Sequence, residues 1–382
     1  MKLETLRTQF IDLYGPGTYL TFHSPGRVNL ISDHTDYNGG YVLPCALSLG
    51  TYGVARKNDS RHLRFASTEF GGVPVVVDLD AVVYNKEHKW VNYLLGVVAE
   101  FQKMGIELSG VDLLISGDLP SSAGLSSSAS IELLMSVVLD TLFDCNIPMV
   151  EQVLLAQRAE NQFVGVSCGI MDQFAIGMGK QDRAMLLDCK TLECRYIPVV
   201  LGEHSLVISN TNSPRSLADS KYNERRGECE SAARQLGVEL LCELTPAQFE
   251  ARAHEITDPV ALKRVAHVIY ENQRAIEGAQ CLEQGNLAAF GKLMSDSHIS
   301  LRDLYEVTGT ALDTLVEAAW AQPGVLGSRM TGAGFGGCTV SLVENAHIDG
   351  FIEQVGRIYQ EKMGIAATFY VADIGDGTRR VE

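Results

Sequence analysis

The sequence lacks several features that would each assign it to a broad class of protein. None of its nine cysteines forms a CxxC pair, so neither a zinc site nor a redox dithiol has support. No apolar run reaches the length of a membrane span, and the first residues are too charged for a secretion signal. Lys and Arg number 31 against 47 Asp and Glu, which disfavours a nucleic-acid partner. We therefore expect a cytoplasmic protein with reduced thiols and no nucleic-acid or membrane partner.

The pattern of apolar residues predicts a mixed α and β chain in two parts. Its 382 residues are long enough for more than one core. The first part is expected to contain strands at 63–65, 73–77 and 111–115 and helices at 90–104 and 150–163. After a strand at 205–209, the pattern predicts helices at 219–236, 259–283 and 311–320 and a closing β-α-β unit at 338–342, 348–363 and 367–372. We place the boundary near residue 200, which gives domains 1–200 and 201–382 and an α+β fold class.

A glycine and a run of serines, residues 123–130 (AGLSSSAS), stand between the strand at 111–115 and a helical pattern from Ile131. Unpaired N–H groups and the positive end of the helix dipole favour an anion at such a helix start. Ordinary N-capping by serine explains the segment equally well. No Walker lysine follows the glycine, so the segment alone does not decide between the two.

A second polar segment, residues 25–40, places Arg27, Asp33, His34 and Asp36 within ten residues and ends in two glycines. Carboxylates and an imidazole at this spacing can bind several hydroxyls of a polyhydroxylated ligand. A polar turn that satisfies its own backbone is the alternative. His34 has no second histidine at helical spacing, so a hydrogen-bonding role is favoured over a metal-binding one.

Two acids, Glu160 and Asp172, lie twelve residues apart. A shielded carboxylate close to an arginine suits phosphoryl transfer to a hydroxyl, and a second carboxylate suits Mg²⁺. Taken singly, each acid is more often a solvated surface group.

The glycine-rich run 332–337 (GAGFGG) fits the GxGxxG spacing, but an apparent strand follows it where a Rossmann loop needs a helix. A glycine turn that packs against another loop or a phosphate remains possible. Trp90 and Tyr93 lie three residues apart on one helical face, where they either flank a purine or pack in the core.

Four segments together resemble one family, the GHMP small-molecule kinases, and within it the members that phosphorylate galactose. They are residues 25–38 (PGRVNLISDHTDYN), 124–130 (GLSSSAS), 168–173 (CGIMDQ) and 330–337 (MTGAGFGG). The resemblance extends over essentially the whole chain. It implies an N-terminal α/β half with ribosomal-S5-like topology, a ferredoxin-like C-terminal half and an active site in the cleft between them.

The resemblance also implies a role for individual residues. Arg27 and Asp172 are expected to be catalytic. Galactose contacts are expected from Asp33, His34, Asp36, Gly169 and Tyr222. ATP contacts are expected from Trp90, Tyr93, Ala123, Gly124, Leu125, Ser126, Ser127, Ser128 and Gly334, with Ser128 and Glu160 near Mg²⁺.

One departure from the family concerns the sugar. Its galactose-phosphorylating members usually read Gly-Glu-His-Thr-Asp where this chain reads Ser-Asp-His-Thr-Asp at 32–36. The carboxylate of Asp33 is therefore set back by about 1.5 Å, one carbon–carbon step. Ser32 in place of glycine can also alter the local backbone. Both changes bear on sugar choice more than on the reaction.

The resemblance implies transfer of phosphate from ATP to the anomeric hydroxyl of α-D-galactose, with ATP and Mg²⁺ as cofactors. One alternative is a family kinase that prefers N-acetylgalactosamine or a pentose. A catalytically silent sensor of galactose and ATP is a third reading, although the serine run, Arg27 and Asp172 are all present. We expect a monomer or a weak homodimer.

Overall fold

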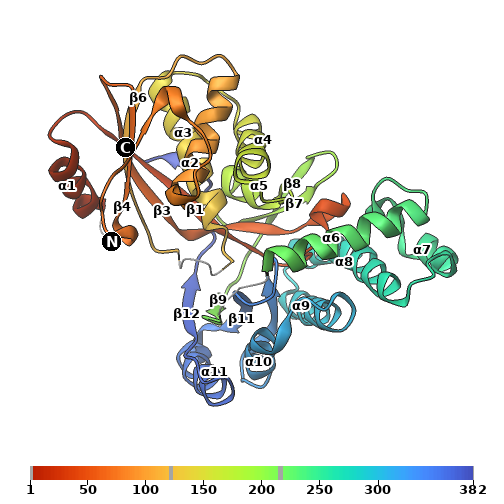
Figure 1. Cartoon of the computed structure of the whole chain (residues 1–382). Coiled ribbons are helices and arrows are strands. Elements are labelled where there is room, and N and C mark those ends of the chain that lie inside the picture. The colour runs from red at the N-terminus through yellow and green to blue at the C-terminus, as the bar shows by residue number, and fades with distance from the viewer. Residues whose placement is uncertain (1–2, 120–123, 214–217, 382) are drawn as a thin grey trace.

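The computed structural model describes residues 3–119, 124–213 and 218–381, which form three β-sheets with helices packed around them (Figure 1). The largest sheet has the strand order β13-β1-β3-β6-β4-β5. Its strands are β1 (Leu20–Asn29), β3 (Pro44–Asn58), β4 (His62–Ser67), β5 (Val75–Asp78), β6 (Gly110–Gly117) and β13 (Arg379–Arg380). Neighbouring strands are antiparallel except β4 and β6, which are parallel.

A second, antiparallel sheet has the order β10-β11-β9-β12 and is formed by the C-terminal half of the chain. Its strands are β9 (His204–Asn210), β10 (Val325–Thr331), β11 (Cys338–Glu344) and β12 (Thr368–Ala372). The third sheet contains β2 (Tyr41–Val42), β7 (Arg183–Asp188) and β8 (Cys194–Pro198). The last strand, β13, pairs with β1 and so returns the chain to the first sheet.

Helices cover the faces of these sheets. Helix α1 packs on one face of the six-stranded sheet through Leu6 and Phe10, whereas α2 and α3 cover the opposite face (Figure 1). Helices α6 and α7 project to the right of the sheets in Figure 1, whereas the C-terminal part of α8 packs against them. The helices are α1 (Leu3–Tyr14), α2 (Val91–Lys103), α3 (Ser127–Phe143), α4 (Met149–Arg158), α5 (Met171–Met178), α6 (Ala218–Gln235), α7 (Pro246–Arg252), α8 (Pro259–Glu283), α9 (Leu287–Ser300), α10 (Gly309–Trp320) and α11 (Ile348–Met363), with π-helical turns η5 (Ala159–Val164) and η8 (Leu301–Tyr305).

The predicted α+β class is confirmed, and several predicted elements differ in detail. Helix α4 ends at Arg158 and continues as the π-helical turn η5, whereas the sequence predicted one helix over 150–163. The motif at 168–173 is in part helical, because α5 begins at Met171. Strands β1 and β3 were not predicted, since buried polar and glycine residues interrupt the alternation that identifies a half-buried strand.

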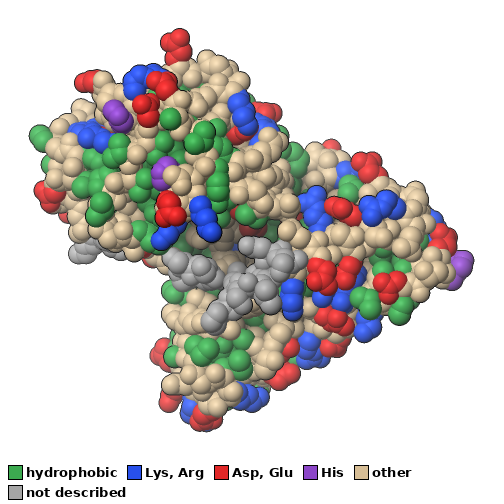
Figure 2. Space-filling view, in the orientation of Figure 1, with side chains coloured by type: hydrophobic (Ala, Val, Ile, Leu, Met, Phe, Trp, Pro, Cys, Tyr) green, Lys and Arg blue, Asp and Glu red, His purple; other side chains and the backbone are tan. Residues whose placement is uncertain are grey.

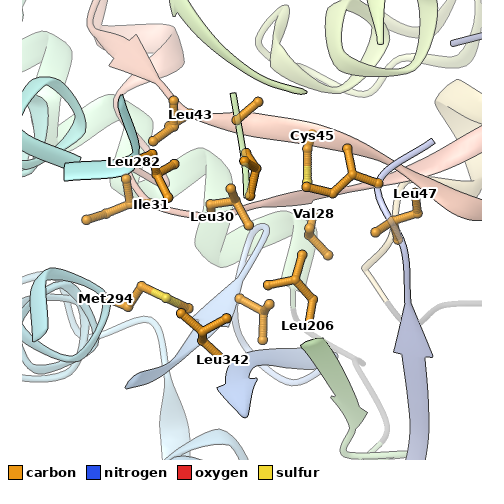
Figure 3. Packing of buried hydrophobic residues seen from close by; sticks show 14 of the residues in the cluster. Val28, Leu30, Ile31, Leu43, Cys45, Leu47, Leu206, Leu282, Met294 and Leu342 are labelled. Carbon is orange, nitrogen blue, oxygen red and sulfur yellow. The ribbon is translucent and has the colours of Figure 1, made fainter. Parts of the chain in front are cut away.

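One hydrophobic cluster joins the two larger sheets. Val28 and Leu30 lie in or beside β1, Cys45 lies in β3, and these side chains face Leu206 of β9 and Leu342 of β11 (Figure 3). Helices α8 and α9 add further apolar side chains to the same cluster. The packing thus fixes the N-terminal strands relative to the C-terminal sheet, and the site is built where they meet.

The surface adds little that points to a large partner. Acidic and basic side chains are interspersed over the face in Figure 2, which is hollowed between the parts that carry the two larger sheets. Within the described ranges, helices of eighteen or more residues are all too polar to cross a membrane.

Candidate active site

Arg27 lies in β1, directly after a break in the pairing of β1 with β3. The register of these strands shifts between Pro25 and Arg27, and proline is tolerated at such a bulge. Gly26 is needed there, because an added Cβ would lie 2.9 Å from the carbonyl oxygen of Leu125. The N–H of Arg27 donates to that oxygen at 3.2 Å. The bulge therefore docks β1 against the serine loop, residues 124–128.

The serine loop leads into α3, and Ser126 occupies the N-cap position with φ 59°. The Ser126 side chain does not cap the helix, and its hydroxyl donates to the carboxylate of Asp172 instead. N-capping is therefore the wrong explanation for Ser126. The first N–H groups of α3 keep their capacity to bind an anion. Ala123, a predicted ATP contact, lies outside the described residues.

Asp172 stands in the first turn of α5 and is paired with Arg27. Nε and Nη2 of Arg27 donate to Oδ1 and Oδ2 of Asp172, each at 2.8 Å. Nη1 of Arg27 donates to the carbonyl oxygen of Gly124 at 2.7 Å. Arg27 is 4% exposed and Asp172 28% exposed. The two predicted catalytic residues thus form a two-pronged ion pair, with the carboxylate accessible from one side.

The accessible side of Asp172 faces a cavity of about 240 Å³, here called the first cavity. All five residues predicted to contact the sugar line it: Asp33, His34, Asp36, Gly169 and Tyr222. Glycine is required at 169, because an added Cβ would overlap the carboxylate of Asp36. Cys168, the first residue of the 168–173 motif, also lines the cavity, as do Val166, Ser167 and Asn223, which belong to no motif that the sequence singled out.

The carboxylate of Asp33 accepts hydrogen bonds from three donors. Its Oδ2 accepts from Nη2 of Arg329 at 2.7 Å, and its Oδ1 accepts from the Asn29 amide at 3.1 Å and the Gly332 N–H at 3.2 Å. Burial raises the pKa of Asp33, and Arg329 opposes that rise. Ser32 adopts φ 80°, in the left-handed region that favours glycine. The short acid is therefore tied to a buried arginine that the sequence did not identify.

Asp36 and His34 both line the first cavity, but they differ in protonation and in the hydrogen bonds that they already make. Burial, together with the charge of Asp172, raises the pKa of Asp36 to about 7. His34 lines the first cavity, yet both of its ring nitrogens already have protein partners, Tyr37 and the carbonyl oxygen of Ala333. The hydrogen-bonding role predicted for His34 is thus directed at the protein, and its sugar contact stays a prediction.

Glu160 and Ser128 come together as the resemblance implied. Glu160 lies in η5 and is 6% exposed. Burial and the nearby charge of Asp172 raise its pKa to about 7, whereas a hydrogen bond with Ser128 lowers it. Clusters of three or more metal-ligating side chains are absent from the described ranges. One carboxylate and one hydroxyl still fit Mg²⁺, which proteins usually hold through one or two carboxylates plus substrate phosphates.

A second cavity, of about 210 Å³, is lined in part by the serine loop. Ser127 and Ser128 line it together with Trp90 and Tyr93. Both aromatic rings also pack against the core cluster of the six-stranded sheet, so the two explanations for them are compatible. The Trp90 ring stacks on Phe70, with centroids 5.8 Å apart, and Phe70 lines the same cavity.

The glycine-rich run 332–337 is a turn that packs on other loops. A Cβ added at Gly332 would lie 3.1 Å from the carbonyl oxygen of Gly124, so the turn touches the serine loop. Gly334, a predicted ATP contact, faces the backbone of Val307 and lines neither cavity. Its φ of 77° requires glycine for a structural reason.

Three family profiles match the chain. The galactokinase galactose-binding signature matches residues 8–57, the GHMP kinase N-terminal domain matches 92–180, and the GHMP kinase C-terminal domain matches 279–361. Full-length relatives include galactokinases of Fusobacterium nucleatum, 51% identical with 100% of both chains covered, and Clostridium acetobutylicum, 53% identical with 99% of both covered.

Solved structures give the same result. A Lactococcus lactis galactokinase in complex with galactose is 45% identical and has a TM-score of 0.96, with 99% of this chain and 100% of that chain covered. The Methanococcus jannaschii mevalonate kinase is 18% identical and has a TM-score of 0.68, with 94% and 99% covered. The second likeness extends to the fold alone.

Proposed function

Because the chain belongs to the GHMP kinase family and to the galactokinases within it, we propose that it transfers phosphate from ATP to the anomeric hydroxyl of α-D-galactose. The observation that carries this proposal is the position of the Arg27–Asp172 pair. The pair lines the first cavity, and through Ser126 it is bonded to the loop that lines the second cavity. A sugar and a nucleotide placed in the two cavities would meet at the serine loop.

Each group at this junction has a chemical task. Asp172 orients the sugar hydroxyl and accepts its proton, and the two N–H bonds from Arg27 hold the carboxylate in one orientation. The N-terminus of α3 and Arg27 stabilise charge on the moving phosphoryl group. Ser128 and Glu160 would hold Mg²⁺, which neutralises phosphate charge when bound.

The two cavities divide recognition between sugar and nucleotide. Asp33, Asp36 and Tyr222 offer polar atoms in the first cavity to the hydroxyls of a hexose. Trp90 and Tyr93 offer flat apolar surfaces in the second cavity to the adenine of ATP. Because Asp33 is shorter than the glutamate usual at this position, the alternative is that the preferred substrate is N-acetylgalactosamine or a pentose in place of galactose.

The decisive experiment measures ADP release with galactose, N-acetylgalactosamine and L-arabinose. We expect galactose to give the highest kcat/KM, and Asp172→Asn to lower kcat by at least a thousandfold while the circular dichroism spectrum stays unchanged. Asp349→Asn is the matched control, because Asp349 also stands in the first turn of a helix, α11, on the surface. Near-normal turnover by Asp172→Asn would contradict the assignment, and ADP release with none of the sugars would favour a sensor.

Two further expectations belong to this proposal. The division into domains 1–200 and 201–382 is testable by limited proteolysis, which should cut first near residue 200. A monomer or weak homodimer is testable by light scattering across a range of protein concentrations.

A further inference from the structure

His34 lies in the wall of the first cavity, but its ring is fully engaged by the protein. Nδ1 lies 2.9 Å from the hydroxyl oxygen of Tyr37, and Nε2 lies 3.1 Å from the carbonyl oxygen of Ala333. The side chain is 4% exposed. A sugar in the cavity therefore meets the ring itself, and neither nitrogen is left to bind a hydroxyl.

The carbonyl oxygen of Ala333 fixes where every proton in this cluster sits. A carbonyl can only accept, so Nε2 of His34 must carry the hydrogen. Burial lowers the pKa of His34 to about 3, so the ring is neutral and Nδ1 is an acceptor for Tyr37. The Tyr305 hydroxyl, 2.7 Å away, then donates to Tyr37, and the Cys229 thiol, 3.2 Å away, donates to Tyr305. All four hydrogen bonds run in one direction, from Cys229 to Ala333.

This chain of hydrogen bonds joins four segments that are distant in sequence. Cys229 is in α6, and Tyr305 is in η8. His34 and Tyr37 are in residues 25–40, here called the sugar segment, and Ala333 is in the glycine-rich turn. Tyr305 is fully buried, and its ring centroid lies 4.9 Å from that of His34. Cys229 is 1% exposed. The Cys229–Tyr305 end of this chain of hydrogen bonds is therefore shielded from water.

The Ala333 end of the chain is next to contacts that shape the site. The neighbouring residue, Gly332, donates its N–H to Asp33 and packs against the carbonyl oxygen of Gly124 in the serine loop. His34 itself has φ 68°, a left-handed backbone that an L-residue keeps only when its surroundings hold it. A shift of the His34 ring would thus move the glycine-rich turn relative to both the sugar segment and the serine loop.

We propose that His34 is a positioning residue, which clamps the glycine-rich turn to the sugar segment through its Nε2–H, and that Tyr37 and Tyr305 hold its ring in place. The kinetic consequences of this inference rest on the proposed galactokinase function, whereas the state of the ring does not. The wall of the first cavity then has the same geometry before and after galactose binds.

The first test reads the ring directly by NMR of protein with ¹⁵N-labelled histidine rings. The chain has nine histidines, and the signal lost in His34→Gln identifies His34. We expect a neutral ring with the hydrogen on Nε2 at pH 7 and at pH 5.5, unchanged when galactose is added. A hydrogen on Nδ1 or a charged ring would overturn the proposal. So would a change in the Nε2 chemical shift on addition of galactose, because it would mean that Nε2 had lost or exchanged its hydrogen-bond partner.

The second test uses variants that mimic one nitrogen at a time. A glutamine amide nitrogen falls near the position of Nε2, and that of asparagine falls near Nδ1. We expect His34→Asn to lower kcat/KM for galactose about ten- to a hundredfold further than His34→Gln does, chiefly through KM. Equal activity of the two variants, or equal loss, would overturn the clamp.

Tyr37→Phe tests the support of the ring. It removes one hydroxyl without changing volume, and we expect a five- to thirtyfold higher KM for galactose with little change in KM for ATP. Tyr196→Phe is the control, because the Tyr196 hydroxyl also donates one hydrogen bond, at 2.7 Å to the backbone carbonyl of Met178, which is not part of this hydrogen-bonded chain. An unchanged galactose KM in Tyr37→Phe would overturn its supporting role. If the wild type released no ADP with any sugar, the proposed function would fail while the NMR result still decided the state of His34.

Discussion

The ion pair between Asp33 and Arg329 gives the sharpest test of how this site is built. Asp33 is 1% exposed and Arg329 is not exposed at all, and their closest atoms are 2.7 Å apart. The next acid near Arg329 is Glu271, at 3.9 Å. We propose three variants: Asp33→Asn, Arg329→Met and the double variant. Asparagine preserves the shape of the side chain, so the first variant removes charge and very little volume.

The expected loss follows from burial. Removal of one partner from a buried ion pair costs about 3–5 kcal/mol, because the other charge stays buried without compensation. Glu271 still faces Arg329 in Asp33→Asn, so we expect the lower end, about 3 kcal/mol. With an unfolding entropy of about 2.1 cal/mol/K per residue, a chain of 382 residues should lose about 4 °C in Tm.

Urea unfolding at pH 7.5, followed by fluorescence, measures all three variants. The double variant should cost about 2 kcal/mol less than the sum of the single variants, because both charges leave together. The exposed pair Arg61–Asp80 is the control, and its cycle should show no measurable coupling. Additive losses for Asp33 and Arg329 would refute the reasoning, since they would mean that the pair does not act as a unit.

Further predictions concern pH, backbone and metal. Burial lowers the pKa of His23 to about 4, so below pH 6.5 the unfolded chain takes up a proton at His23 that the folded chain does not. The contribution of His23 to the free energy of unfolding should fall by about 2 kcal/mol between pH 7.5 and 5.0, and urea titrations should show that difference between wild type and His23→Leu. Gly334→Ala should destabilise the fold by more than 2 kcal/mol, because its Cβ would overlap the carbonyl of Val307 and its φ is 77°. Gly285→Ala, with φ 66° but no atom within 4 Å of its Cβ, should cost only about 1 kcal/mol, and equal losses would show that overlap is unimportant. Glu160→Gln should raise the Mg²⁺ concentration that gives half-maximal rate by about tenfold or more. It should also weaken Mn²⁺ binding, measured by electron spin resonance with ADP present. Unchanged Mn²⁺ binding would show that Glu160 is not a metal ligand.

Helices with a full set of local signals were predictable from the sequence. The predicted bounds of α8, 259–283, agree with the structure. Asp258 accepts from the N–H of Val260 at the helix start, and Pro259 follows it in the first turn, where proline is tolerated. These signals act within one turn of the chain, so a single sequence contains them. The motifs of the site were readable for the same reason.

Contacts between distant segments were not predictable. Arg329 and Asp33 are 296 residues apart, and Ala333 and His34 are 299 apart. The chain has 31 Lys and Arg residues, and nothing in the sequence marks Arg329 as one whose side chain is fully buried. His34 was predicted to form hydrogen bonds, and both of its ring nitrogens do so with protein partners. The sequence could not tell that its partners belong to the protein.

The site contains two aspartate–arginine pairs, and their exposure predicts different kinetic roles. Asp172 is 28% exposed beside Arg27, so its carboxylate can reach a hydroxyl in the first cavity. Asp33 is 1% exposed, and its oxygens already accept three hydrogen bonds, so it acts mainly on the shape of the sugar segment. Loss of an interaction made only in the transition state lowers kcat, whereas loss of ground-state binding raises KM. Arg27→Met should therefore lower kcat with a small change in galactose KM, and Asp33→Asn should do the reverse. If both variants changed kcat alone, Asp33 would belong to the reacting groups, and sugar choice would have to be sought elsewhere in the cavity.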